Sequence, residues 1–217
     1  KLNISEYEII LVNDGSKDSS IDKILDNYKN ENIKIINLSK NFGHHQATMT
    51  AYKYCSGDFV FFIDSDLEVD PSVFEDLWNN SSDCDLIYAK TKKKYDGLVR
   101  KFQSNLFYNI LNMFSEIKYN PENLNVILFK KKCIDSILKY EEKNIVTFSI
   151  YNLIGFRNKG VYIEKKTKKN STYTLFKKID LGLEFLISTT TRPIKILFYM
   201  SLINIIIFTV FSIKIFF

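Results

Sequence analysis

Three short apolar runs, each followed by a polar turn, alternate with helical segments over the first 66 residues. The runs span 8–12, 33–38 and 59–63 and are rich in branched or aromatic residues. Between them, apolar side chains at helical spacing predict helices over 20–28 and 46–55. Strands that alternate with helices pair in parallel through right-handed crossovers, and ligands collect at the carboxyl ends of such strands. The sequence therefore predicts an α/β fold with a Rossmann-like, mostly parallel sheet flanked by helices.

The same alternation continues beyond the third run. A helix over 72–78 and a strand over 85–89 are followed by a long amphipathic helix over 98–114, whose apolar residues recur every four positions. A further strand is expected over 126–129 and a second apolar helix over 172–187. The amphipathic helix either packs on the sheet or lies in a membrane interface, and we favour the interface because a membrane anchor follows.

The C-terminal segment 194–217 is almost wholly apolar, with Lys195 and Lys214 as its charged residues. About 20 apolar residues cross the hydrocarbon core, so this segment predicts a transmembrane helix centred on 197–213, with a buried core helix as the alternative. Four basic residues precede or open it: Lys177, Lys178, Arg192 and Lys195. By the positive-inside rule they place the preceding domain on the cytoplasmic face of the cell membrane.

Length, charge and cysteine content narrow the class of protein. A chain of 217 residues supports one main domain with an appendage. The net charge is +5, and lysines cluster around residues 90–94, 130–132 and 165–169, which indicates anionic phosphates or an anionic membrane as partners unless the clusters are simply solvated. The three cysteines are far apart and lack C-x-x-C spacing, which argues for a reducing compartment and against a disulfide frame or a zinc site.

Carboxylates follow two of the predicted strands. Asp14 and Asp18 come after the first run, while Asp64 and Asp66 come directly after the third. In a parallel sheet both loops open on the same edge, so four carboxylates could converge on one crevice, where a divalent cation would relieve their repulsion. An isolated D-x-D is commonly a surface turn, but one at the end of a buried strand fits Mg²⁺ or Mn²⁺ holding a diphosphate.

Three successive stretches carry a family resemblance. VNDGSKDSS (12–20), NFGHHQA (41–47) and GDFVFFIDSDLEVDP (57–71) resemble the signatures of inverting family 2 glycosyltransferases with the GT-A fold. The chain is more narrowly similar to the branch that moves a sugar from a nucleotide donor to a polyisoprenyl phosphate. The resemblance covers nearly the whole chain and implies a catalytic domain over 1–170, a juxtamembrane interface helix over 171–193 and a transmembrane segment over 194–217.

The resemblance also implies roles for individual residues. Asp64 and Asp66 would hold the Mg²⁺ or Mn²⁺ that bridges the donor diphosphate, and Asn125 stands at the position of the catalytic base. The candidates for substrate binding are Asp14, Gly15, Ser16, Asp18, His44, His45, Glu68, Lys166, Ser171 and Tyr173. Of these, the two histidines are also compatible with a solvated loop, and Glu68 with an acid beside a helix. The implied partners are a nucleotide sugar, a polyprenyl phosphate lipid and the membrane, with no nucleic acid; association into a homo-oligomer is a further option.

The sequence departs from the family pattern in three places. No stretch before Tyr7 resembles the family's first strand; the sheet lacks a central member if that strand is truly absent and does not precede the given sequence. Asn125 and Ile127 replace an aspartate and an arginine, and Lys166 replaces an arginine, which removes a bidentate phosphate donor. Asparagine cannot act as a base, but a phosphate monoester has a second pKa of about 6 and is already largely ionised at neutral pH.

Three other functions are compatible with these residues. A family 2 transferase could act on a glycan or a lipid-linked oligosaccharide instead of a lipid phosphate. An apolar strand ending in D-x-D also occurs in phosphatases that form an aspartyl phosphate, although there the motif usually follows the first strand. Because Asn125 and Ile127 depart from the pattern, a catalytically degenerate membrane protein that binds nucleotide is the third alternative.

Overall fold

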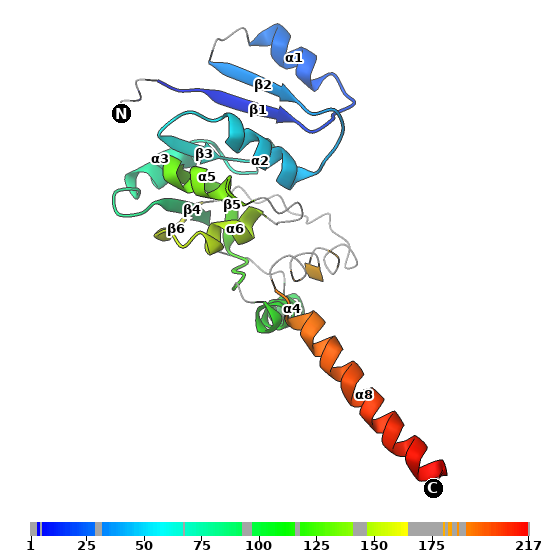
Figure 1. Cartoon of the computed structure of the whole chain (residues 1–217). Helices are drawn as coiled ribbons and strands as arrows, with labels where there is room; N and C mark the ends of the chain where they lie inside the picture. The colour runs from blue at the N-terminus through cyan, green and yellow to red at the C-terminus, as the bar shows by residue number, and fades with distance from the viewer. Residues whose placement is uncertain are drawn as a thin grey trace. The chain divides into compact units, whose positions relative to one another are not determined.

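A computed structural model of the chain describes residues 4, 6–28, 32–66, 68–92, 97–115, 118–140, 147–164, 180, 182–183, 186 and 190–216. The chain divides into two compact units (Figure 1). The first unit comprises Lys1–Lys94 with Pro121–Asn170, and the second comprises Tyr95–Asn120 with Ser171–Phe217.

The first unit contains most of the helices and strands. In chain order these are β1 (Ile9–Asn13), α1 (Ser20–Asn27), β2 (Ile33–Asn37), α2 (His44–Tyr54), β3 (Phe59–Phe62), α3 (Val73–Asn79), β4 (Leu86–Lys90), β5 (Asn123–Lys130), α5 (Lys131–Ile137), α6 (Thr147–Leu153) and β6 (Asn158–Tyr162). The elements expected from the sequence up to β5 are confirmed, with ends that differ by a few residues. α5, α6 and β6 have no counterpart among the elements predicted from the sequence.

The strands form two sheets. β1 and β2 pair in parallel, and a second sheet has the order β3-β5-β4-β6. β5 is antiparallel to both of its neighbours, whereas β4 and β6 are parallel, so β3, β4 and β6 share one direction. Their carboxyl ends therefore lie at one edge of the sheet, and the amino end of β5 lies at that same edge.

The core of the first unit lies on the two faces of the four-stranded sheet. Side chains alternate along β5: Ile127 and Phe129 contribute to one buried cluster, while Val126 and Leu128 contribute to the other. The first cluster is completed by buried residues of α2, α5 and α6, and the second by buried residues of α3. Helices thus cover both faces, as a sheet with apolar side chains on each face requires.

β1 and β3 are linked ahead of their first residues but share no ladder in the described part of the chain. Glu8, just ahead of β1, accepts hydrogen bonds from the backbone N–H and hydroxyl of Ser56, just ahead of β3, both at 2.6 Å. Although both strands are apolar, none of their residues is fully buried. Among the described residues, each of these strands pairs on one edge only, and proteins usually cover or protect the unpaired edge of a sheet.

The second unit contains α4 (Leu98–Phe114) and α8 (Arg192–Phe216). α4 has the predicted bounds and an exposed apolar stripe of Leu98, Phe102, Leu106 and Ile110. Its other side packs at Gly182, where an added Cβ would lie 2.9 Å from the Phe107 ring. The placement of α4 in a membrane interface remains a prediction.

α8 confirms the long apolar helix expected at the C-terminal segment. Within Arg192–Ile215, the most apolar 18-residue stretch has a mean hydropathy of 2.3, and none of this stretch is buried against the protein. By length and composition this helix could cross a membrane. Near its start, Arg192 Nη1 donates a hydrogen bond to the Met113 carbonyl at 3.4 Å, so the end of α4 and the start of α8 are in contact within the second unit.

Candidate active site at the carboxyl edge of the sheet

The antiparallel pairing of β3 and β5 brings Asn125 to Asp64. Phe62 pairs with Ile127, so two residues further along β3 the chain reaches Asp64 opposite Asn125. The Asn125 Nδ2 atom lies 3.4 Å from Asp64 Oδ1 and 3.5 Å from Oδ2. An amide NH₂ group donates, and both carboxylate oxygens accept, so this contact fixes the orientation of the Asn125 amide.

His44 completes this group from the start of α2. Its Nε2 atom lies 3.1 Å from Asn125 Nδ2 and 3.9 Å from Asp64 Oδ1. The ring also contacts Phe62 edge-on, with 6.2 Å between ring centroids. Of the two neighbouring histidines, His44 faces Asp64. His45 is more than half buried, and its burial and the adjacent His44 lower its pKa.

The Asp64 carboxyl group carries negative charge that its surroundings compensate poorly. Burial raises its pKa, and the nearby carboxylates Asp66 and Glu68 act in the same direction, while His44 and Asn125 oppose them. One Asp66 oxygen accepts the Glu68 backbone N–H at 2.9 Å. The side chain of Asp64 is 40% exposed, so a ligand can reach it.

A divalent cation fits the chemistry of these donors. Carboxylate oxygens are preferred ligands of Mg²⁺ and Mn²⁺, and both ions usually retain positions for phosphate oxygens and water. Among the described residues, no three His, Cys, Asp or Glu side chains gather around one point. Asp64 and its neighbour Asp66 are the carboxylates that would hold such an ion at this edge.

Asp14 holds the loop that leads into α2. Its two carboxylate oxygens accept the backbone N–H groups of Phe42 at 2.7 Å and Gly43 at 2.9 Å. Gly15 follows with φ +72°, and a Cβ there would lie 2.7 Å from the Asn41 nitrogen. The DGS turn and the NFGH loop are thus packed together, directly ahead of His44.

The other residues predicted for the site that the structure describes have local contacts of their own. The Ser16 backbone N–H donates to Asn13 Oδ1 at 2.9 Å, and Asp18 Oδ1 accepts the Ser20 N–H at 3.1 Å in an exposed turn before α1. Within the part of the chain that the structure describes, no contact joins Asp14 or Asp18 to Asp64. Lys166, Ser171 and Tyr173 lie outside the described residues.

Two tyrosines behind the site were not expected from the sequence. The hydroxyl groups of Tyr52 in α2 and Tyr151 in α6 are buried and 2.7 Å apart. The Tyr52 ring packs edge-on against Phe62, the same residue that contacts His44. These tyrosines are 99 positions apart in the chain, and neither lies in a recognisable motif.

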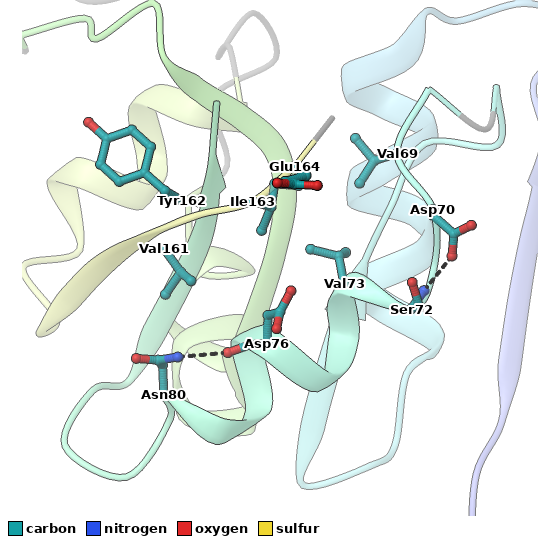
Figure 2. Close-up of a pocket in the computed structure, with 10 residues that line it drawn as sticks. All are labelled: Val69, Asp70, Ser72, Val73, Asp76, Asn80, Val161, Tyr162, Ile163 and Glu164. Carbon is teal, nitrogen blue, oxygen red and sulfur yellow. Dashed lines mark hydrogen bonds between the residues drawn. The ribbon is translucent and has the colours of Figure 1, made fainter. Parts of the chain in front are cut away.

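A cavity lies beside α3, separate from the predicted site. It has a volume of about 430 Å³ and includes none of Asp14, Asp64 or Asp66 in its lining. Figure 2 shows the carboxyl groups of Asp76, from α3, and Glu164, just after β6, on two sides of this cavity.

One of the basic clusters is engaged in structural contacts. Lys132 Nζ lies 2.8 Å and Lys130 Nζ 3.5 Å from Asp85 Oδ1, and this carboxylate is almost inaccessible to solvent. Because β5 runs against β3 and β4, Lys130 stands at the sheet edge opposite to Asp64. Cluster 130–132 is therefore placed to hold Asp85, away from the edge where Asp64 and Asn125 meet.

The family model of glycosyl transferase family 2 matches residues 1–136, a region that contains both the DGS turn and the D-x-D motif. The chain belongs to this family. Its curated family 2 relatives include longer proteins. The chain spans 58% to 63% of the lengths of four of them.

Two relatives and one solved structure illustrate the likeness. An uncharacterized glycosyltransferase of Synechocystis is 29% identical over 201 residues, covering 89% of this chain and 63% of that protein. An undecaprenyl-phosphate 4-deoxy-4-formamido-L-arabinose transferase of Proteus mirabilis is 25% identical over 198 residues, covering 88% of this chain and 60% of that protein. Glucosyl-3-phosphoglycerate synthase from Mycobacterium tuberculosis, solved with UDP, aligns with a TM-score of 0.56 at 15% identity, covering 84% of this chain and 68% of that one. The structural match shows that the α/β fold is GT-A-like.

Proposed function

We propose that this family 2 protein transfers a sugar from a nucleotide-sugar donor to a polyprenyl phosphate, with inversion at the sugar carbon and with a divalent cation. The undecaprenyl-phosphate transferase of Proteus mirabilis is a relative named for such an acceptor, which supports the acceptor class. The proposal is carried by one observation, the neutral Asn125 amide that lies against Asp64 where the resemblance places a base.

The chemistry of the acceptor explains why an amide suffices at this position. A sugar hydroxyl must lose a proton as it attacks, and asparagine has no usable basicity to accept it. A phosphate monoester is largely ionised at neutral pH, since its second pKa is about 6. Its oxygen can attack the sugar carbon directly while the bond from that carbon to the diphosphate oxygen breaks on the opposite face. Asn125 therefore favours an acceptor that brings its own negative charge.

Asp64 and Asp66 would hold the cation at the end of β3. When bound, Mg²⁺ or Mn²⁺ neutralises the charge that develops on the departing nucleoside diphosphate. The chain's own contribution is to fix the two carboxylates. Asn125 donates to Asp64, and the Glu68 backbone N–H donates to Asp66, so neither side chain has to be reorganised during the reaction.

A lipid acceptor requires the site to work beside a membrane. The 25-residue helix α8 would anchor the chain, and the exposed apolar stripe of α4 would lie in the interface. Arg192 and Lys195, at the start of α8, favour a cytoplasmic position for the catalytic domain by the positive-inside rule. Nucleotide sugars are polar and would reach the site from that side.

The direct test is transfer by the full chain in membranes. Radiolabelled UDP-, GDP- and dTDP-sugars are supplied with undecaprenyl phosphate, with and without a chelator. Label should enter the organic phase as a phosphate-linked, acid-labile product, and the chelator should prevent this. The variant Asp66→Ala should lose the transfer, whereas Asp76→Ala, a matched change of an acid in α3, should retain it.

Two results would contradict the proposal. Label that enters a glycan or a lipid-linked oligosaccharide instead of the lipid phosphate would exclude the acceptor class. Transfer that persists in Asp66→Ala, or in the presence of the chelator, would exclude the role assigned to the cation.

A further inference from the structure

The imidazole of His44 is held in one orientation by Asn125. The Asn125 amide must point its NH₂ group toward Asp64, because turning it over would set its oxygen against two carboxylate oxygens. The same NH₂ group lies 3.1 Å from His44 Nε2. An NH₂ group only donates, so Nε2 must accept, and the ring hydrogen is on Nδ1.

The Nδ1–H group is left available for a ligand. Within the described part of the chain the His44 side chain makes no hydrogen bond besides the one to Asn125. The His44 side chain is 52% exposed, so a ligand can reach the ring. Contact with Phe62 and the position at the first turn of α2 restrict how far the ring can turn.

We propose that His44 is a substrate-binding residue that donates its Nδ1–H to a phosphate oxygen, and that Asn125 is the positioning residue that sets this donor. The inference rests on the proposed function, since it requires a phosphate at the carboxyl edge beside Asp64. The ligand class is an anionic phosphate oxygen, which either the donor diphosphate or the acceptor lipid phosphate could supply. In this role Asn125 positions His44, which does not require Asn125 to act as a base.

Two amide substitutions separate the two ring nitrogens. Asn places an amide nitrogen close to the position of Nδ1, whereas Gln places one close to Nε2. His44→Asn should therefore retain most of the binding, and His44→Gln should lose it. Asn125→Leu, which removes the positioning contact without adding charge, should weaken binding of the same ligand. Thr50→Ala, on the same helix α2, is the control.

The test is direct binding to the full chain in detergent with two probes. One probe is UDP or GDP with Mn²⁺, and the other is undecaprenyl phosphate in mixed micelles. A hydrogen bond to a charged group contributes enough that its loss should raise Kd by about 10- to 100-fold. We expect His44→Gln and Asn125→Leu to do so for one probe, which identifies the phosphate that His44 contacts, and His44→Asn to stay within about threefold of the unsubstituted chain.

The possible results distinguish a failure of this inference from a failure of the proposed function. If the unsubstituted chain binds both probes and His44→Gln binds them equally well, the inference is wrong and the proposed function stands. Equal losses in His44→Asn and His44→Gln would also overturn it, because a specific Nδ1 donor would then not be involved. A chain that binds neither probe would contradict the proposed function and this inference together. Amide exchange of β4 and β5, compared with Thr50→Ala, checks that each variant is folded.

Discussion

Comparing Gly15→Ala with Gly155→Ala should distinguish the cost of backbone strain from the cost of steric overlap at the turn that contains Asp14 and Gly15. Gly15 has φ +72°, in the left-handed region that residues with a Cβ avoid. An added Cβ would also lie 2.7 Å from the Asn41 nitrogen and 2.8 Å from the Lys40 carbonyl carbon, both of them backbone atoms. Gly155 offers a matched control, because its φ is +68° and nothing lies within 4 Å of its Cβ position.

The two contributions have different magnitudes. Alanine in the left-handed region costs about 1–2 kcal/mol, and the loss of chain freedom in the unfolded state offsets this by about 0.4–1 kcal/mol. Gly155→Ala should therefore lower the free energy of unfolding by about 1 kcal/mol. Gly15→Ala should lower it by a further 1–3 kcal/mol, roughly the cost of overpacking, because the backbone at Lys40 and Asn41 must move.

Two assays report this difference. Urea titration can be followed by the fluorescence of Trp78, the sole tryptophan, which packs on Phe59 with 4.7 Å between ring centroids. Amide exchange should show faster exchange at Phe42 and Gly43 in Gly15→Ala, since their N–H groups donate to Asp14. Equal destabilisation by the two substitutions would refute the reasoning, because it would mean that the DGS turn and the NFGH loop are not in close contact.

Three further perturbations test other parts of the account. Tyr151→Phe should lower the free energy of unfolding by about 1–2 kcal/mol in a urea titration, because it leaves the buried Tyr52 hydroxyl without its partner. Hydrogen bonds lower the pKa of Glu8 from its ordinary value of 4.5 to about 2, and the bond from Lys34 has the largest effect. Glu8 therefore contributes stability above pH 4.5 that is lost as pH falls toward 2, and this part of the acid titration of stability should disappear in Glu8→Gln. Phe102→Asp should change the stability by less than about 0.5 kcal/mol, because the side chain is 68% exposed, but should reduce transfer to a membrane-embedded acceptor more than to a short-chain, water-soluble one.

Local patterns in the sequence were sufficient to predict most of the first strands and helices. The apolar run that ends at Asp64 and the four-residue repeat of α4 both appear in the structure, because strand burial and helix amphipathicity leave direct periodic signals. α5 and β6 were missed for different reasons. α5 begins at Lys131 directly after β5 with no intervening turn, and β6 is a short run with polar residues that pairs along the sheet edge with β4.

The site could be predicted only in part. The motif spacing predicts a role for Asp64 and Asp66, which stays a prediction. The contact of Asn125 with Asp64 depends on β5 running antiparallel to β3, which no local pattern encodes. The association of His44 with Asn125 spans 81 positions and follows from that pairing. The lysine cluster at 130–132 indicated an anionic phosphate or membrane as partner unless it was simply solvated. The reversed direction of β5 places this cluster at the other edge of the sheet, where Lys130 and Lys132 lie against Asp85.

The central claim is that the acidic end of β3 holds a cation together with a nucleoside diphosphate. Electron paramagnetic resonance of Mn²⁺ measures this directly, because the signal of the free ion decreases as the ion binds. With UDP or GDP present, the full chain should bind one Mn²⁺ per chain, Asp76→Ala should bind it equally well, and Asp66→Ala should lose the binding. Unchanged Mn²⁺ binding in Asp66→Ala, or no nucleotide-dependent binding by the unsubstituted chain, would contradict the account.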